Sequence, residues 1–247
     1  LMTDDVVLLT KAFEKTKDEK YARFASKLIE TWFLNPSTRQ TPHLNFGQGI
    51  PGINTGRGIG IIETRLLYKI TDAATRLRTS KTWTAEKHAA LKAWFSSYLT
   101  WLLESPIGLD EADEHNNHGT YYDVQVVNYA LFVGKDELAR KQLEVTKKRI
   151  ESQIKPDGSQ PFEMARTKSL GYCVMNLTGF FLLADLADKI KLDLWHYQSP
   201  SGASLGKAFA YLKPYLNKEK AWTHQQIVPF DAKEGEDLLS KGTKMYQ

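Results

Sequence analysis

Apolar residues recur at steps of three and four positions along most of the chain, and this spacing most constrains the fold. The period matches the α-helical turn, so each such segment presents one apolar face. Residues 18–34 illustrate it, with Tyr21, Phe24, Ala25, Leu28 and Trp32. The spacing predicts helices over residues 3–16, 18–34, 58–79, 84–103, 119–133, 136–154, 169–190 and 203–215. Since no stretch shows sustained strand alternation, we predict an all-α protein.

Turn signals divide these helices into successive antiparallel pairs. Pro36 follows the second segment, and "SPIG" follows the one over residues 84–103. We interpret the pattern as an (α/α) toroid, or an incomplete barrel of helix hairpins, formed by residues 1–247 as a single domain. A helical solenoid that binds proteins is the alternative, although no fixed-period repeat supports it.

Composition excludes several classes of protein. With 42% hydrophobic and 25% charged residues, the chain reads as an ordinary globular protein. Its net charge of +4 mildly favours an anionic ligand. The basic residues are scattered along the chain, which argues against binding of nucleic acid. No run approaches the roughly 18 apolar residues of a membrane span, so we expect no membrane partner. The single cysteine, Cys173, lies among apolar residues and should be a buried free thiol.

A glycine-rich connection, "PHLNFGQGIPGINTGRGIGIIETR", covers residues 42–65 and holds six glycines. Its literal G-x-G-x-x-G contains Pro51 and follows no strand, so we reject a dinucleotide site. The connection is either an irregular crossover or a flexible wall that presents polar side chains to a ligand. Amides and a guanidinium suit hydroxyls and carboxylates. The candidate binding residues are therefore Asn45, Gln48, Asn54 and Arg57.

The densest polar cluster is "HNNHGTYYDVQ", residues 115–125. A helix that begins near His118 places His118, Tyr122, Gln125 and Tyr129 on one face, where two tyrosines are more typical of a lined cavity than of open surface. The plainer interpretation is an N-cap by Asn116 or Asn117, which is compatible with catalysis. A zinc site at His115 and His118 lacks a convincing third ligand, so we expect no metal and no cofactor.

A third connection, "KPDGSQPFEMARTKSLGY", covers residues 155–172 and carries Glu163, Arg166 and Tyr172. A tyrosine with a pKa of about 10 is a poor base at neutral pH, but a nearby arginine favours the phenolate, and Arg166 is the natural neighbour. A tyrosine beside a core stripe is also often only structural. An asparagine, a histidine, an arginine and a tyrosine in one cleft can nevertheless remove a proton next to a carboxylate and protonate a leaving oxygen.

The blocks "LNFGQGIPGINTGRGIGIIETR", "NNHGTYYDVQ" and "DGSQPFEMARTKSLGY" occur in the order seen in the alginate lyase superfamily of polysaccharide lyases, which the chain resembles from about residue 5 to about residue 215. The resemblance implies an (α/α) toroid that cleaves a uronic-acid polymer, most often alginate, by β-elimination and leaves unsaturated uronate ends. It places the neutralising amide on Asn117, the histidine on His118, the arginine on Arg166 and the tyrosine on Tyr172. We add Tyr122, Gln125 and Glu163 as candidate substrate-binding residues.

Each implied role has a physical basis. Asn117, helped by His118 or Arg166, would stabilise the charge that develops on the uronate carboxylate when the C5 proton leaves. Tyr172 would protonate the departing oxygen and, for mannuronate or glucuronate, also act as base. For guluronate, where proton and leaving group lie on opposite faces, His118 is the expected base. Family members carry a further N-terminal stretch and an export signal, so we expect a trimmed chain and a periplasmic or secreted protein.

Other classes of function remain open. Glucuronan or another uronate polymer could replace alginate as the substrate. A non-catalytic carbohydrate-binding or scaffold protein would keep the helices without the proton relay. A glycoside hydrolase would need two carboxylates roughly 5 to 9.5 Å apart, and Glu63, Asp123 and Glu163 are available. The product distinguishes them, since only elimination leaves a conjugated double bond that absorbs in the ultraviolet.

Overall fold

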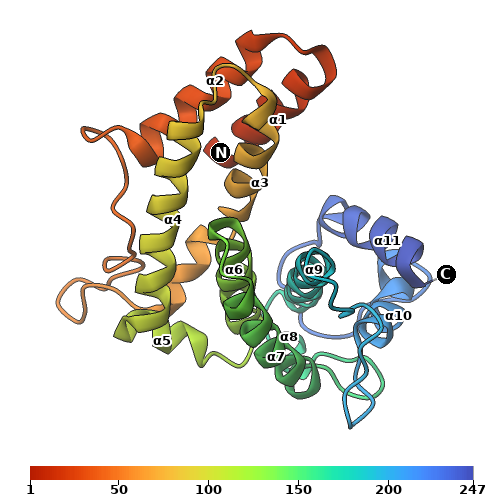
Figure 1. The fold of residues 1–247 in the computed structure, drawn as a ribbon. Coiled ribbons are helices and arrows are strands. Elements are labelled where there is room, and N and C mark those ends of the chain that lie inside the picture. The colour runs from red at the N-terminus through yellow and green to blue at the C-terminus, as the bar shows by residue number, and fades with distance from the viewer. Residues whose placement is uncertain (247) are drawn as a thin grey trace. The chain divides into compact units, whose positions relative to one another are not determined.

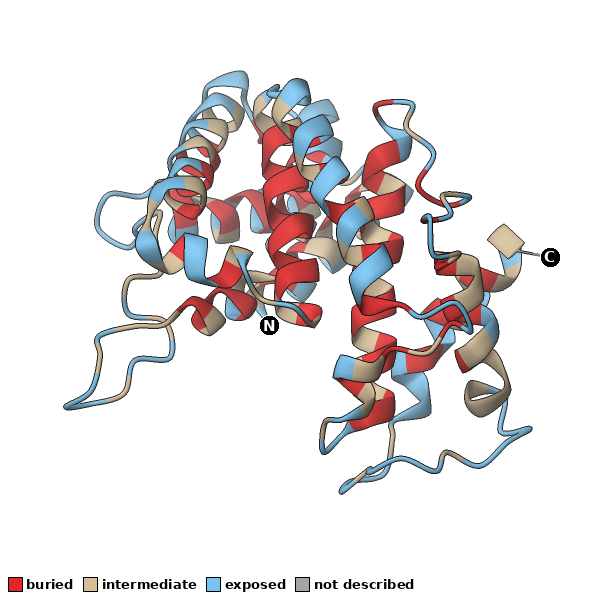
Figure 2. Cartoon of the chain, turned by 90° about the horizontal axis from the view of Figure 1, so that it is seen from below, coloured by how far each residue is buried: buried red, intermediate tan, exposed pale blue. Residues whose placement is uncertain are grey.

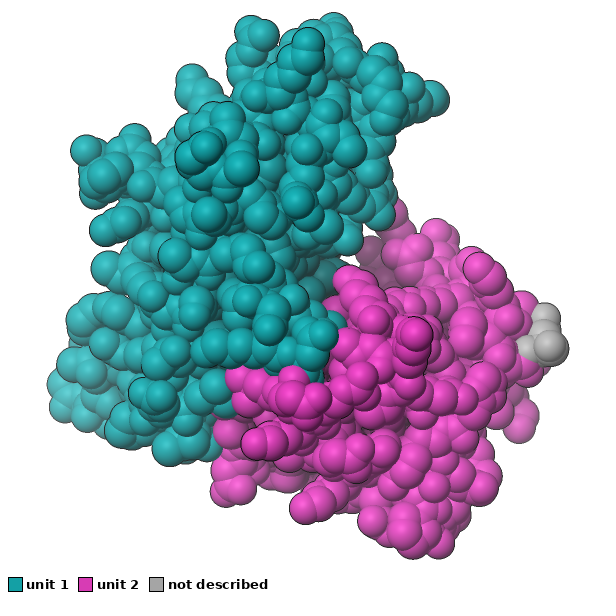
Figure 3. Space-filling model, viewed as in Figure 1, with its two compact units in different colours: residues 1–111, 128–136 teal, residues 112–127, 137–247 magenta. Residues whose placement is uncertain are grey.

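The computed structural model describes residues 1–246, in which helices alternate with connections and no strand forms (Figure 1). Extended pairing in this range is limited to isolated bridges such as Lys168 with Gln226. The all-α prediction is confirmed. Residue contacts divide the chain into two compact units, residues 1–111 with 128–136 and residues 112–127 with 137–247 (Figure 3). The assignment to a single domain stays a prediction.

The first unit is built on a helix hairpin. Its helices are α1 (Met2–Thr16), α2 (Glu19–Ile29), α3 (Tyr68–Arg76), α4 (Ala85–Glu104) and most of α5 (Pro106–Ala112). α1 packs against both α2 and α3, which confirms the predicted pairing of the first two helices. The Asp18 side chain caps α2 by accepting from the Lys20 N–H, and Thr84 caps α4 by accepting from the Lys87 N–H.

The helix predicted over residues 58–79 is wrong as a continuous element. A 3₁₀ helix, η2 (Gly58–Thr64), comes first, α3 follows, and a short 3₁₀ turn, η3 (Leu77–Thr79), ends the segment. Glycine is a poor helix former, and here it serves close packing instead. A Cβ on Gly60 would strike the backbone of Gly47. The glycines therefore let two parts of the connection touch, which a regular helix would prevent.

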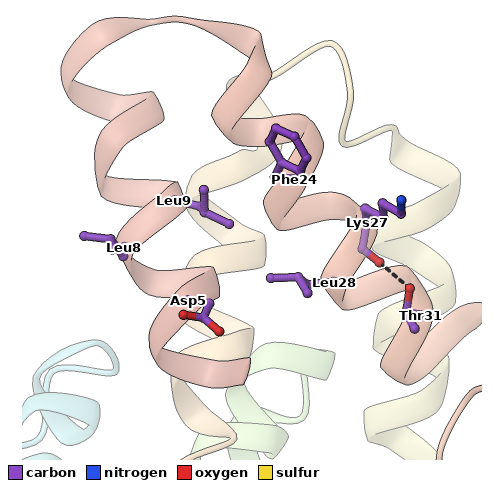
Figure 4. A pocket seen from close by; sticks show the side chains of 7 residues that line it. All are labelled: Asp5, Leu8, Leu9, Phe24, Lys27, Leu28 and Thr31. Atoms are coloured by element: carbon purple, nitrogen blue, oxygen red, sulfur yellow. Dashed lines mark hydrogen bonds between the residues drawn. The ribbon is translucent and has the colours of Figure 1, made fainter. Parts of the chain in front are cut away.

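The buried face of α2 differs from the stripe picked out by the spacing. Ala25 of that stripe is fully buried, but so are Ala22 and Ile29 outside it, whereas Phe24 is 58% exposed. Phe24 and Leu28 line an open groove together with Leu8 and Leu9 of α1 (Figure 4). α2 is thus apolar on two faces, and only one of them is covered within residues 1–246. Most helices show the simpler pattern of a buried stripe and an exposed one (Figure 2).

The second unit is organised around α9 (Ser169–Asp188). The other helices are the beginning of α6 (Asn117–Val133), α7 (Asp136–Gln153), α8 (Pro161–Met164), α10 (Leu205–Leu216) and α11 (Ala232–Tyr246). α9 packs against α8, α10 and α11. Its predicted apolar stripe is confirmed, since the following residues are all buried: Leu170, Cys173, Leu177, Phe181 and Ala184. Cys173 is a free, buried thiol, as expected.

Two features of this unit correct the sequence interpretation. α9 is long and apolar enough to meet the length and composition of a membrane span, contrary to our expectation that no run would. Because 67% of its most apolar window is buried inside the protein, the helix has the environment of a core helix. The short helix α8 and the terminal helix α11 were not predicted, as was also the case for α5.

Candidate functional site

The polar cluster of residues 115–125 begins helix α6. Asn116 accepts a hydrogen bond from the His118 N–H at 2.9 Å, so the predicted N-cap is present. Gly119 lies against the Glu114 carbonyl and the Arg149 guanidinium, where a Cβ would collide with both. The glycine is therefore required by close packing at the start of the helix.

A buried ion pair fixes the segment that leads into α6. The Arg149 guanidinium donates to Asp123 Oδ2 at 3.0 Å and to the backbone carbonyls of Glu114 at 2.7 Å and Ala112 at 2.5 Å. Gln142 and Thr146 also donate to the Asp123 carboxylate, which is fully buried. Asp123 is thus engaged in holding α6 and its lead-in segment to α7, and it is saturated with partners.

A second buried carboxylate, Glu163, holds Asn117. It lies on the short helix α8, which starts with proline at its first position, a favourable place for that residue. Glu163 Oε1 accepts from the Asn117 backbone N–H at 2.6 Å, and its two oxygens lie 3.1 and 2.9 Å from Asn117 Nδ2. Hydrogen bonds to a charged acceptor are about twice as strong as neutral ones. The carboxylate therefore fixes which end of the Asn117 amide points toward it.

The charges around Glu163 bring two further candidates into the same site. Burial raises the pKa of the Glu163 carboxyl, while the hydrogen bonds from Asn117 and the positive charges of Arg166 and His118 lower it, so the pKa lies above its usual value. Burial also raises the pKa of the Cys173 thiol, and the Glu163 charge adds to that effect. Arg166 and His118 are thus close enough to Glu163 to act on its charge.

Arg166 and Tyr172 are stacked. The Arg166 guanidinium carbon lies 4.0 Å from the centroid of the Tyr172 ring, a cation–π geometry. The Arg166 N–H donates to the Glu163 carbonyl at 3.0 Å, and Tyr172 lies in the first turn of α9, where it is half-buried. The second unit therefore gathers Asn117, His118, Glu163, Arg166 and Tyr172, which we call the helix-end cluster.

A buried amide network lies next to this cluster and was missed from the sequence. Asn176 Nδ2 donates to Gln153 Oε1 at 3.0 Å and to Gln160 Oε1 at 2.9 Å. Gln153 Nε2 donates to the Asn116 carbonyl at 3.2 Å, and Gln160 Nε2 donates to the Cys173 carbonyl at 3.1 Å. The signal was an asparagine inside the otherwise apolar helix α9. These amides tie the starts of α6 and α9 to the end of α7.

The other candidates on α6 are packed inside the protein. Tyr122 is 3% exposed, and Gln125 is fully buried with its Nε2 donating to the Tyr121 carbonyl at 3.3 Å. Burial raises the pKa of Tyr122, and the neighbouring Asp123 charge raises it further. Tyr129 packs on Phe95 in the first unit, with ring centroids 4.8 Å apart. Every residue of α6 from Gly119 to Ala130 is buried, so burial does not distinguish the predicted cavity-lining face, and a substrate-binding role for Tyr122 and Gln125 stays a prediction.

The candidates of residues 42–65 lie in the first unit, and we call Asn45, Gln48, Asn54 and Arg57 the loop group. Asn45 Oδ1 accepts from Trp101 Nε1 at 2.8 Å, and Asn54 Oδ1 accepts from the Ile50 N–H at 3.1 Å. Gln48 donates to Glu63 at 2.9 Å, and Arg57 Nε donates to the Gln48 carbonyl at 3.0 Å. These side chains hold the connection together, and their contact with a ligand stays a prediction.

The structure also bears on metal binding and on hydrolysis. Within residues 1–246, no three histidine, cysteine or acidic side chains are grouped closely enough to hold a metal ion. His115 is exposed, and its ring lies edge-on to Phe162 at 4.7 Å. Asp123 and Glu163, two of the carboxylates that a hydrolase could use, are both buried and engaged with Arg149 and Asn117.

The chain is similar in sequence and in structure to known proteins of one family. The family model described as alginate lyase matches residues 1–222. A crystallised alginate lyase from Bacteroides ovatus is similar in structure, with a TM-score of 0.92 and 36% sequence identity. The match covers 99% of this chain and 65% of that one, so the chain spans about two thirds of its length. The predicted (α/α) toroid is consistent with this likeness. No curated protein shows a significant match.

Proposed function

The chain belongs to the alginate lyase family, and on that premise we propose that it is a polysaccharide lyase that cleaves alginate by β-elimination. The helix-end cluster carries the proposal. An amide, an imidazole and a guanidinium act on one buried carboxylate, and the guanidinium is stacked on a phenol ring. These are the groups needed to bind a uronate carboxylate and to move a proton beside it.

The first task is to stabilise charge on the uronate. Removal of the C5 proton shifts electron density onto the neighbouring carboxylate, which then approaches a dianion. Asn117 is held by its backbone N–H and its side-chain nitrogen before any ligand arrives. The Asn117 Nδ2 carries two N–H groups, and we assign one to Glu163 and the other to the uronate carboxylate. A donor that is already oriented needs little reorganisation in the transition state, and such donors are typically worth a factor of 10² to 10³ in rate. Arg166 supplies the positive charge, and a neutral His118 remains able to accept a proton.

The second task is proton transfer. The C5–H bond and the C4–O bond break while a double bond forms between C4 and C5, and the departing oxygen takes a proton. Tyr172 is half-buried at the first turn of α9, with Arg166 over its ring. We assign it the proton for the leaving oxygen, and for mannuronate also the role of base, since both events then occur on one face of the sugar. For guluronate we assign the base role to His118.

The polymer itself implies where the protein works. A polysaccharide too large to cross a membrane must be cut outside the cytosol, so we propose a periplasmic or secreted protein. The scattered net charge of +4 is compatible with a polyanionic substrate. The loop group is proposed as a further set of substrate contacts, with smaller individual contributions than the helix-end cluster, whereas the burial of Tyr122 and Gln125 argues against direct contact with a polymer.

Ultraviolet absorbance tests the proposal. The protein is incubated separately with polymannuronate, polyguluronate and glucuronan, and the band of the unsaturated uronate is followed with time. We expect a rise with at least one of the two alginate blocks. A rise with glucuronan alone would replace alginate as the substrate, and no rise with any polymer would contradict a lyase acting on these uronates.

A further inference from the structure

The proposed function assigns no role to the segment Trp222–Ile227 of the second unit. This segment follows α10 and precedes α11, and it lies almost wholly beyond the residues matched by the family model. We call it the strap. It pairs with residues 167–170, the short link between Arg166 and Tyr172. The Ile227 N–H donates to the Thr167 carbonyl at 2.9 Å, and the Ser169 N–H donates to the Gln225 carbonyl at 3.1 Å.

The strap also caps α9. Lys168, the residue at the N-cap position, makes no side-chain capping bond. Gln226 supplies it instead, because its Oε1 accepts from the Leu170 N–H at 3.0 Å. Its Nε2 donates to the Val228 carbonyl at 2.9 Å, which fixes the orientation of the amide. The N–H groups of the first helical turn have no acceptor within the helix, and the Leu170 N–H finds one on a side chain 56 residues away.

Ser169 and Trp222 complete the joint. The Ser169 hydroxyl donates to the Gln225 carbonyl at 2.6 Å and accepts from Trp222 Nε1 at 2.8 Å. Trp222 is held in turn by Tyr215 of α10, with the two rings edge to face at 4.9 Å. Backbone pairing, an amide cap and an anchored indole therefore converge on the link over residues 167–170.

From this joint we infer that the strap is a positioning element that sets the stacking of Arg166 on Tyr172, with Gln226 as its main side-chain contributor. Arg166 is fixed on one side through its N–H to the Glu163 carbonyl. Tyr172 lies in the first turn of α9, so its position depends on how firmly the start of that helix is held. Displacements of about 1 Å at reacting groups can cost a factor of 10² in rate, so a loosened joint should lower turnover. The inference rests on the proposed function for its kinetic readout.

The test compares three variants. Gln226→Ala removes the cap, Gln226→Glu keeps an acceptor oxygen, and Gln225→Ala is the matched control. The control removes a neighbouring amide of the same type whose exposed side chain makes no hydrogen bond within residues 1–246, and it keeps the backbone carbonyl. We expect Gln226→Ala to lower kcat about 3- to 30-fold with KM within twofold, Gln226→Glu to recover most of the loss, and Gln225→Ala to match the unmodified protein.

Amide hydrogen exchange provides a readout that needs no activity. Exchange at Leu170 should be faster in Gln226→Ala, while exchange in the middle of α9 stays unchanged. Unchanged exchange at Leu170, or an equal kcat for Gln226→Ala and Gln225→Ala, would overturn the inference. A rise in KM alone would also overturn it, because the strap would then be a substrate contact. Failure of the unmodified protein to cleave any uronate polymer counts against the proposed function and leaves the exchange result to decide the strap.

Discussion

The helix-end cluster and the loop group have similar residue types but different supports. Both contain an arginine and at least one amide side chain. In the helix-end cluster the polar groups lie at the starts of α6 and α9 and on α8, and a buried carboxylate holds the central amide. In the loop group the amides and Arg57 bind mostly to one another, to the backbone of the same connection or to the nearby Trp101.

This difference predicts different kinds of contribution. A side chain held by a buried partner keeps its orientation before a ligand arrives, which favours transition-state stabilisation. A side chain that maintains a glycine-rich connection can contact a ligand only by exchanging its present partners, which limits its net contribution to binding. We therefore expect substitutions in the helix-end cluster to lower kcat, and those in the loop group to raise KM.

The largest effect is expected from Tyr172→Phe. The substitution removes one proton-transferring oxygen and almost no contact area, so kcat should fall by on the order of 10³-fold while affinity for the polymer changes little. Initial rates by ultraviolet absorbance and binding by calorimetry measure the two quantities. Tyr197→Phe, a partly exposed tyrosine in the same unit, serves as the control. Near-normal elimination by Tyr172→Phe would remove tyrosine from the mechanism.

Glu163→Gln should come next, with kcat lowered about 10- to 100-fold and KM nearly unchanged. A glutamine keeps the volume, but it offers only one acceptor oxygen and brings an NH₂ group toward the donors of Asn117. Steady-state kinetics measure the split between the two constants. Glu151→Gln, on an exposed part of α7, is the matched control. A variant that raised KM and kept kcat would show that Glu163 binds substrate and does not orient Asn117.

His118→Ala should separate the two alginate blocks. If His118 is the base only for guluronate, the loss of kcat on polyguluronate should exceed that on polymannuronate by at least roughly tenfold, since a general base typically contributes about 10²- to 10⁴-fold. The rates are compared on the two block polymers, with the exposed neighbour substituted as His115→Ala for control. Equal losses on both polymers would leave no case for a histidine base.

Arg57→Ala should have a small effect, and it should change KM and not kcat. We expect KM to rise about two- to fivefold, with kcat within twofold, because a partly exposed charge contact contributes little. Arg39→Ala, on the exposed connection after α2, controls for the loss of one positive charge toward a polyanion. A large fall in kcat for Arg57→Ala would place the loop group in the catalytic machinery. It would contradict the predicted difference between the loop group and the helix-end cluster.

The smallest effect concerns stability and pH. Burial keeps the pKa of Glu163 above its unfolded value, so the folded protein holds this proton more tightly than the unfolded chain does. The stability that this provides is present below the unfolded pKa and is lost as the pH rises through the folded one. Glu163→Gln cannot lose the proton, so urea unfolding should show it gaining stability relative to the unmodified protein as the pH rises. A pH-independent difference would contradict the shift.

Periodicity predicted the helices well where a single face is buried. The stripe of α9 from Leu170 to Ala184 is an example, since every predicted member is buried. It failed where packing depends on contacts distant in sequence. Residues 58–79 read as one helix, but the contact of Gly60 with Gly47 requires an irregular path. On α2, the spacing favoured Phe24 and Leu28 together with Ala25, whereas the tertiary structure buries Ala25 together with Ala22 and Ile29.

The candidate site shows the same limit. Residue types and order singled out Asn117, His118, Arg166 and Tyr172. The structure brings Asn117, His118 and Arg166 near Glu163 and stacks Tyr172 on Arg166. The role of Glu163 could not be predicted, because its bond to Asn117 joins residues 46 positions apart and no local pattern signals it. The contribution of Gln226 to α9 was equally hidden, as a glutamine in an unassigned polar segment carries no spacing that points to Leu170.

The mass of the products distinguishes elimination from hydrolysis. A defined alginate oligosaccharide is digested with the protein, and the fragments are weighed by mass spectrometry. Elimination adds nothing from solvent, so we expect fragments whose masses sum to that of the parent, with the unsaturated sugar at the new non-reducing end. Fragments whose masses sum to the parent plus one water would show hydrolysis, and the protein would then not be a lyase.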